Sequence, residues 1–178
     1  MNIKPQILQF ELWQECNTHC PFCFLTEENT KYTPKERKIT SCHKVLEKIS
    51  DESIYNQYDT LSFIGGEFFQ GQINDVDVHK AFFELFTKVA ELYNRKIIKG
   101  VWLCATLAIG NQKDLYDLLD LFDDLDNFWI LTSWDTLGRF RTPKMFNTWH
   151  NNMINLHKTY PSLKFNITTI LTGDLIEK

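Results

Sequence analysis

Short apolar runs alternate with amphipathic segments along most of the chain, and this alternation constrains the fold more than any other feature. Five runs have the length and character of β-strands, and they cover residues 7–13, 60–64, 101–108, 128–132 and 165–171. Strands and helices that alternate at this pitch are typical of right-handed βαβ units. We therefore predict an α/β fold built on a parallel sheet.

The segments between these runs predict helices. The clearest spans residues 78–92, where apolar side chains recur at helical spacing and would bury one face. Further helices are expected to residue 49 from an N-cap at Thr40 or Ser41, near 115–122 after a cap close to Asn111, and over about 144–158. The 178 residues contain no internal repeat and no linker, so we expect one domain spanning 1–178.

Composition excludes several classes of protein. Hydrophobic residues make up 43% of the chain, which is too many for a disordered protein. A net charge of −4 provides no basic surface for nucleic acid. No apolar run approaches the roughly 20 residues of a membrane span, and the N-terminus lacks the features of a signal peptide. We therefore expect a cytoplasmic protein without nucleic-acid or membrane partners.

Polar and glycine-rich residues follow the predicted strands. A cysteine cluster follows the first strand, Gly-Gly-Glu the second, Ser-Trp-Asp the fourth and Thr-Gly-Asp the fifth. In parallel α/β folds, ligands bind at the carboxyl ends of the strands. The functional site is therefore expected at this edge of the sheet.

The cysteine cluster is the strongest chemical signal. Cys16, Cys20 and Cys23 are spaced C-x3-C-x2-C, whereas Cys42 and Cys104 stand alone and are expected to be structural. In a reducing compartment, clustered thiols indicate metal ligation or catalysis rather than disulfides. Thiolates select zinc or iron–sulfur clusters. Three of them leave one coordination position open, which is typical of a reactive site, although a histidine fourth ligand at position 19 would close a Cys3His zinc site.

The sequence at this point resembles the radical S-adenosylmethionine superfamily, through the Cys16-x3-Cys20-x-Phe22-Cys23 motif and Gly-Gly-Glu after the second strand. The resemblance implies a partial (βα) barrel and a [4Fe–4S] cluster held by the three cysteines, with S-adenosylmethionine on the fourth iron. Reductive cleavage would give methionine and a 5′-deoxyadenosyl radical that abstracts hydrogen from an unknown peptide or small-molecule substrate. An electron donor such as flavodoxin or ferredoxin is also implied. No catalytic side chain is indicated.

The resemblance also implies cofactor contacts. Gly65 and Gly66 would allow close backbone approach to a ligand, and Glu67 would accept a hydrogen bond from the ammonium of the methionine moiety. The alternative is a tight turn followed by a solvated glutamate. Phe22 would lie near the adenine or pack against the cluster, and Phe68 replaces the proline that often follows the glutamate in the family.

Later positions resemble the family more weakly. Ser133 and Asp135 match a Ser-x-Asp that contacts ribose or substrate, although Asp135 would equally cap a turn.

Arg139 and Arg141 are candidates for binding a carboxylate or phosphate. On the first strand, Gln9 and Glu11 would share one face, and a buried carboxylate there would need a partner.

Several alternatives stay open. The superfamily usually builds six βα units and only five strands are legible, so the chain is either a compact version or lacks its C-terminal part. Small glycyl-radical activases share the cysteine spacing. A zinc-stapled binding module using Cys16, His19, Cys20 and Cys23 is the main alternative outside the superfamily. A catalytically inactive barrel that serves as an interaction scaffold is another.

Overall fold

The computed structural model of the protein describes residues 6–16, 18, 32–108, 110, 112–134 and 142–169. The elements follow in the order β1 (Ile7–Glu11), α2 (Lys35–Ser50), the 3-10 helix η1 (Glu52–Asn56), β2 (Thr60–Ile64), α3 (Val76–Asn94), β3 (Gly100–Cys104), α4 (Lys113–Leu119), β4 (Phe128–Ser133), α5 (Pro143–Thr159) and β5 (Lys164–Thr168). Within these residues, none of the helices combines the length and apolarity that a bilayer crossing requires.

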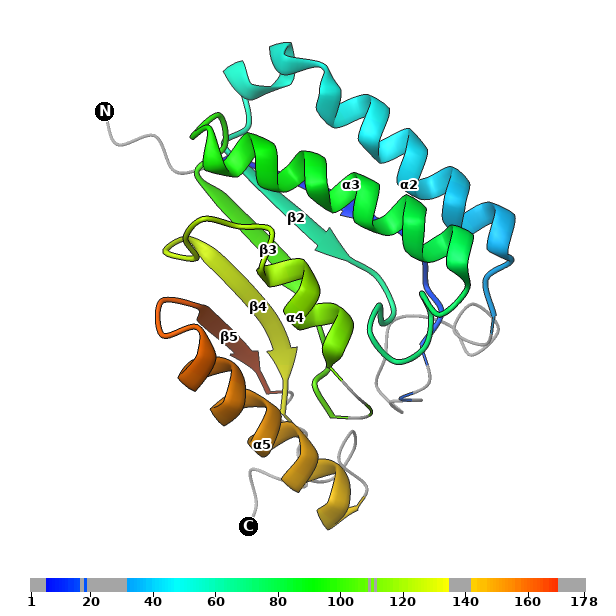
Figure 1. The fold of residues 1–178 in the computed structure, drawn as a ribbon, viewed down its shortest axis with the longest axis vertical. Helices are drawn as coiled ribbons and strands as arrows, with labels where there is room; N and C mark the ends of the chain where they lie inside the picture. Colours follow the sequence, from blue (N-terminus) through cyan, green and yellow to red (C-terminus); the bar gives the residue numbers. More distant parts are fainter. Residues whose placement is uncertain are drawn as a thin grey trace.

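The five strands form one parallel sheet in the order β1-β2-β3-β4-β5. As formed by the described strands, the sheet is open rather than closed, and Figure 1 shows helices α2 to α5 on one side of it. The predicted α/β class, a partial barrel whose five legible strands are parallel and alternate with helices, is confirmed. All five strands end at one edge, which we call the carboxyl edge; the opposite edge is the amino edge.

The core lies between the sheet and the helices. Alternate strand residues point toward the helices and are buried: Leu61, Phe63, Val101, Leu103, Phe128 and Ile130. Aromatic rings from α3 fill this layer, with Phe86 4.8 Å from Phe63 and 4.7 Å from Phe82 between ring centroids. The opposite face of the sheet is less buried and carries Trp102, Cys104 and Trp129.

Helix α2 departs most from the sequence-based expectation. Thr40 and Ser41 lie inside the helix, which begins at Lys35 after Pro34 and has no side-chain cap. The buried positions of α2 are Lys38, Cys42, Val45 and Ile49, at helical spacing. Because the first of them is a lysine, the apolar stripe in the sequence begins one turn after the first buried position of the helix. Cys42 is fully buried, which raises the pKa of its thiol to about 12 and confirms its structural role.

Two other boundaries differ. Strand β3 ends at Cys104, although the apolar run continues to Ala108. The residues after Cys104 stay buried, but Leu107 has a φ of 58°, which an extended strand does not adopt. Helix α4 begins at Lys113 after Gln112, and the expected cap at Asn111 lies outside the described residues. Cys104, also expected to be structural, is half-buried on the less covered face and does not belong to the buried core.

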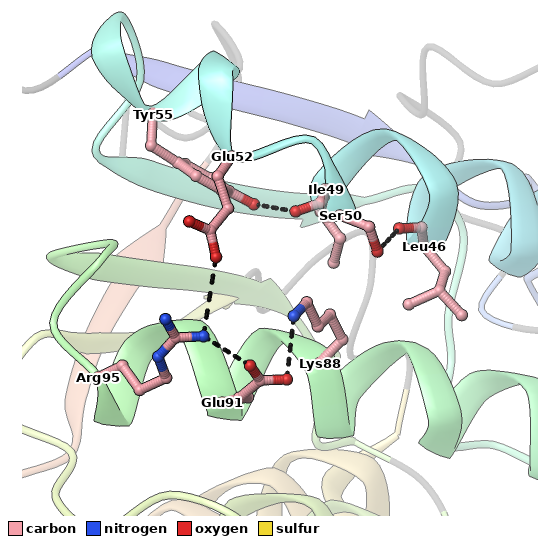
Figure 2. Close-up of polar contacts among 8 residues, drawn as sticks. All are labelled: Leu46, Ile49, Ser50, Glu52, Tyr55, Lys88, Glu91 and Arg95. Carbon is pink, nitrogen blue, oxygen red and sulfur yellow. Dashed lines mark hydrogen bonds and ion pairs between the residues drawn. The ribbon is translucent and has the colours of Figure 1, made fainter.

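At the amino edge, surface contacts join the ends of α2, η1 and α3 (Figure 2). The Tyr55 hydroxyl donates to the Ile49 carbonyl at 2.6 Å. Arg95 Nη1 lies 3.7 Å from a Glu52 carboxylate oxygen and 2.8 Å from one of Glu91. More than half of the Arg95 and Glu52 side chains is exposed, so these ion pairs are shared with water.

Candidate functional site

The described site residues gather at the carboxyl edge, as predicted. Cys16 follows β1, Gly65 to Glu67 follow β2, and Ser133 ends β4. The other predicted site residues lie outside the described part of the chain: His19, Cys20, Phe22, Cys23, Asp135, Arg139 and Arg141. The described part of the candidate site therefore consists of Cys16, the Gly-Gly-Glu segment and their neighbours.

The two glycines lie directly against the chain that leads into the cysteines. Gly66 N–H donates to the Trp13 carbonyl at 2.9 Å, and Glu67 N–H donates to the Glu15 carbonyl at 2.9 Å. A Cβ on Gly66 would lie 2.1 Å from the Glu15 carbonyl oxygen. A Cβ on Gly65, which has a φ of +150°, would lie 2.1 Å from that of Trp13. Glycine is therefore required here by close approach of the protein's own backbone.

Glu67 is 1% exposed, so the alternative of a solvated glutamate is wrong. Its Oε1 accepts hydrogen bonds from the backbone N–H groups of Phe68 and Phe69 at 2.9 and 3.0 Å. Its Oε2 accepts from Thr106 N–H at 2.6 Å. Hydrogen bonds from backbone donors stabilise a buried carboxylate. The Glu67 side chain thereby joins the ends of β2 and β3 at a fixed position.

A polar network continues from this point across the carboxyl edge. Thr132 Oγ1 donates to the Thr106 carbonyl at 3.2 Å and accepts from Trp149 Nε1 at 3.1 Å. Gln70 Nε2 donates to Thr106 Oγ1 at 2.8 Å. The network connects Glu67 to helix α5. It was not predicted, because Thr106 and Thr132 lie within apolar runs of the sequence that gave no sign of a polar network.

Cys16 is half-buried, and its Sγ lies 2.9 Å from the Oγ1 of the buried Thr18. The thiol is thus held at the carboxyl edge beside the Gly-Gly-Glu segment, where the sequence predicted a cluster ligand. One cysteine in this position, with two more within the next seven residues of the sequence, is a donor set that fits an iron–sulfur cluster.

Ser133 is half-buried and pairs in register with Thr168 of β5. Alternation along β4 places its side chain on the sheet face away from the helices, the same face as Trp129. Gln9 and Glu11 are both exposed, and Glu11 accepts a hydrogen bond from Gln14 Nε2 at 2.5 Å. The Glu11 carboxylate is therefore not buried, and the need for a partner that burial would create does not arise.

Sequence reasoning also missed an ion pair next to Cys16, formed by a buried lysine and a half-buried glutamate. Lys38 Nζ lies 2.8 Å from Glu15 Oε2. The available signals were a lysine in the buried stripe of α2 and a glutamate directly before Cys16. Neither residue type suggests burial by itself, since lysine and glutamate are almost never fully buried unless they are paired.

Comparison with protein families identifies this arrangement. A family model described as a 4Fe-4S single cluster domain matches residues 8–130, which covers the cysteines and the Gly-Gly-Glu segment. The chain belongs to this family. Its membership confirms the predicted relationship to the radical S-adenosylmethionine superfamily and the predicted [4Fe–4S] cluster.

Two individual proteins are also similar to this 4Fe-4S domain. An S-adenosylmethionine-dependent nucleotide dehydratase of Flammeovirga pacifica is 32% identical over 66 residues, which are 37% of this chain and 22% of the relative. The crystal structure of Streptococcus suis SuiB matches 93% of this chain and 50% of its own, with 13% identity and a TM-score of 0.30. The chain therefore spans half or less of each of these proteins.

Proposed function

We propose that this 4Fe-4S domain is a radical enzyme that cleaves S-adenosylmethionine reductively at a cluster held by Cys16, Cys20 and Cys23. The observation that carries the proposal is the position of Cys16, at the carboxyl edge and one residue from the Glu15 carbonyl that binds the Gly-Gly-Glu backbone. When bound, the cluster and S-adenosylmethionine supply the 5′-deoxyadenosyl radical that abstracts hydrogen from the substrate.

Glu67 is proposed to bind the ammonium group of the methionine moiety. Three backbone donors hold its buried carboxylate in one position, so little side-chain freedom is lost when a cation binds. The interaction with an ammonium is a charge-assisted hydrogen bond, which is stronger than a neutral one. Phe22 is proposed to lie near the adenine, and Ser133 and Asp135 to contact ribose or substrate.

The proposed substrate is a peptide or a small molecule. The sequence left peptides and small molecules open, and glycyl-radical activation is a further alternative within the superfamily. Because the Flammeovirga pacifica relative is named for nucleotides, nucleotides are the first small molecules to test. Flavodoxin or ferredoxin is the proposed electron donor.

Low-temperature EPR of the anaerobically reconstituted and reduced protein tests the proposal. A [4Fe–4S]⁺ signal that changes on adding S-adenosylmethionine is expected, together with formation of 5′-deoxyadenosine. Cys16→Ser should remove the S-adenosylmethionine-dependent change. Cys42→Ala is the matched control, because Cys42 is buried inside α2 and should leave the signal intact.

Three other results would contradict the proposal. A colourless, EPR-silent protein that contains zinc and unfolds on chelation would establish the zinc-stapled module. A cluster signal that S-adenosylmethionine does not alter would exclude an open iron site for that molecule. Binding of S-adenosylmethionine without cleavage would identify an inactive scaffold.

A further inference from the structure

A largely buried ion pair lies where residues 16–32 begin. This stretch contains the three cysteines, and we call it the cysteine segment. Lys38 Nζ is 2.8 Å from Glu15 Oε2, and the side chains are 7% and 19% exposed. We propose that Glu15 and Lys38 are positioning residues for the iron–sulfur cluster. Their ion pair holds the cysteine segment in the geometry that binds iron. This inference rests on the proposed function, because it concerns the cluster proposed there.

The contacts of Lys38 show that its ammonium is held in place. Besides the Glu15 carboxylate, Lys38 Nζ donates to the Gln72 carbonyl at 2.9 Å. It also lies 5.6 Å from the centroid of the Trp13 ring, within the range of a cation–π contact. Trp13 and Glu15 follow β1, and Gln72 precedes α3. Lys38 of α2 therefore contacts two separate segments at the carboxyl edge.

The Glu15 carboxylate joins the two ends of the cysteine segment. Glu15 Oε2 accepts a hydrogen bond from Thr33 N–H at 2.9 Å in addition to the contact with Lys38. The chain between Glu15 and Thr33 contains Cys16, Cys20 and Cys23. All three proposed ligands therefore belong to a stretch of sequence whose two ends meet at the Glu15 carboxylate.

The backbone of Glu15 makes a second connection. Its carbonyl accepts from Glu67 N–H at 2.9 Å, so Glu15 binds the Gly-Gly-Glu segment through its backbone and α2 through its side chain. Cys16 is the next residue. A shift of Glu15 would move Cys16 relative to Glu67, the residue proposed to bind the second cofactor.

The chemistry of a buried ion pair explains why its loss would be felt at the cluster. If Lys38 becomes apolar, the Glu15 carboxylate stays in a poorly hydrated place without its cation. It can regain hydration only by moving out, and the Thr33 contact would move with it. Mutation of groups that orient metal ligands typically costs 10–100-fold in metal affinity, so a comparable effect on cluster retention is expected.

Lys35 provides a matched control in the first turn of the same helix. Its Nζ pairs with Asp75 at 3.0 Å and Asp77 at 2.5 Å, and 37% of its side chain is exposed. Lys35→Met therefore removes the same charge from α2 without touching Glu15. A general effect of lost positive charge or lost helix stability would appear in both lysine variants.

The test uses the full chain, reconstituted anaerobically, with Lys38→Met, Glu15→Gln, the double variant and Lys35→Met. Iron and sulfide per chain are measured first, and then the rate at which a chelator removes iron while circular dichroism shows that the fold persists. We expect Lys38→Met and Glu15→Gln each to release iron about tenfold faster than the unchanged protein. The double variant should release iron no faster than the quicker single variant, because both substitutions remove the same contact between Lys38 and Glu15. Lys35→Met should match the unchanged protein.

A spectroscopic readout separates positioning from stability. The EPR change on adding S-adenosylmethionine should shrink in Lys38→Met and Glu15→Gln at equal iron content, which a purely structural role would not produce. Release rates and EPR changes equal to those of the unchanged protein would overturn the inference while leaving the proposed function intact. If the protein without substitutions holds no cluster, both this inference and the proposed function are overturned. If Lys38→Met does not fold, Glu15→Gln decides the question, since it keeps an oxygen for Thr33 N–H.

Discussion

The two ends of the α2–α3 helix pair differ in how polar side chains are used. At the amino edge, Arg95 and Glu52 face each other 3.7 Å apart with more than half of each side chain exposed (Figure 2). At the carboxyl edge, Lys38 and Glu15 are 2.8 Å apart and mostly buried. Exposed pairs contribute about 0–1 kcal/mol to stability, whereas breaking a buried pair costs about 3–5 kcal/mol.

This difference shows where the fold requires exact placement. Burying charged groups is unfavourable unless each of them is paired and hydrogen-bonded. The carboxyl edge nevertheless buries a lysine, and it also buries Glu67, which accepts hydrogen bonds from three backbone N–H groups. The edge that carries the proposed cofactor site is therefore held by specific polar contacts, and the amino edge by surface contacts that tolerate change.

The largest effect on stability is expected from Glu67→Leu. It would leave the backbone N–H groups of Phe68, Phe69 and Thr106 buried without their acceptor, at about 1–3 kcal/mol each. We expect the free energy of unfolding to fall by about 4 kcal/mol in urea titrations. Glu67→Gln keeps one oxygen acceptor and should lose about half as much. Equal stability of Glu67→Leu and the unchanged protein would contradict the contacts described for this carboxylate.

Gly66→Ala should have the next largest effect. The added Cβ would meet the Glu15 carbonyl oxygen at 2.1 Å, so the backbone next to Cys16 has to move. Overpacking of this kind costs about 1–3 kcal/mol. Cluster content should fall more steeply than stability, because the displaced backbone leads into the ligands. Iron analysis alongside urea titration measures both quantities, and a loss of stability with full cluster content would argue against this coupling.

A smaller effect is expected at the N-terminus of α3, on the exposed side of the carboxyl edge. The Asp75 carboxylate caps this helix through the N–H groups of Asp77 and Val78. Its hydrogen bond with Lys35 lowers the pKa of Asp75. Asp75→Ala should lower Tm by about 3 °C at neutral pH.

The pH dependence of this cap follows from the direction of the shift. A carboxyl group whose pKa is lower in the folded state stabilises the fold above its unfolded pKa of about 3.9, and this contribution is lost as the pH falls through the folded value. The difference in Tm between the unchanged protein and Asp75→Ala should therefore narrow at acidic pH. A difference that grows on acidification would contradict this assignment.

The smallest effect is expected at the amino edge. Arg95→Ala removes the contacts with Glu52 and Glu91, which water can replace. We expect a change in Tm of less than about 1 °C and no change in cluster content. A large loss in either quantity would show that the two edges do not differ as described.

The fold was largely predictable because most elements bury a regular apolar pattern. Strand β2 lies where the sequence predicted it, and α3 contains the predicted stripe from Val78 to Leu92. The start of α2 was missed because its first buried position is Lys38, whose burial depends on Glu15 from a distant segment. The end of β3 was missed for a similar reason. The apolar run continues beyond Cys104, and Ala105 to Ala108 are buried although they lie outside the strand.

For the candidate site, the positions of its described residues were predictable, but their contacts were not. Cysteine spacing and parallel strand order placed Cys16 and the Gly-Gly-Glu segment at one edge, where the structure has them. The sequence predicted that the glycines would approach a ligand, and the structure shows them against the Trp13–Glu15 backbone. The acceptor role of Glu67 toward Thr106 depends on the β2–β3 register, which no local pattern encodes.

Burial of Cys42 has a practical consequence for following motions of this protein. With a pKa of about 12, its thiol remains protonated at neutral pH, and alkylating reagents attack the thiolate. Cys42 should therefore react only when α2 separates from the sheet and admits solvent. Pulsed alkylation read by mass spectrometry at this single position would time the opening of α2 with a native residue, without any introduced label.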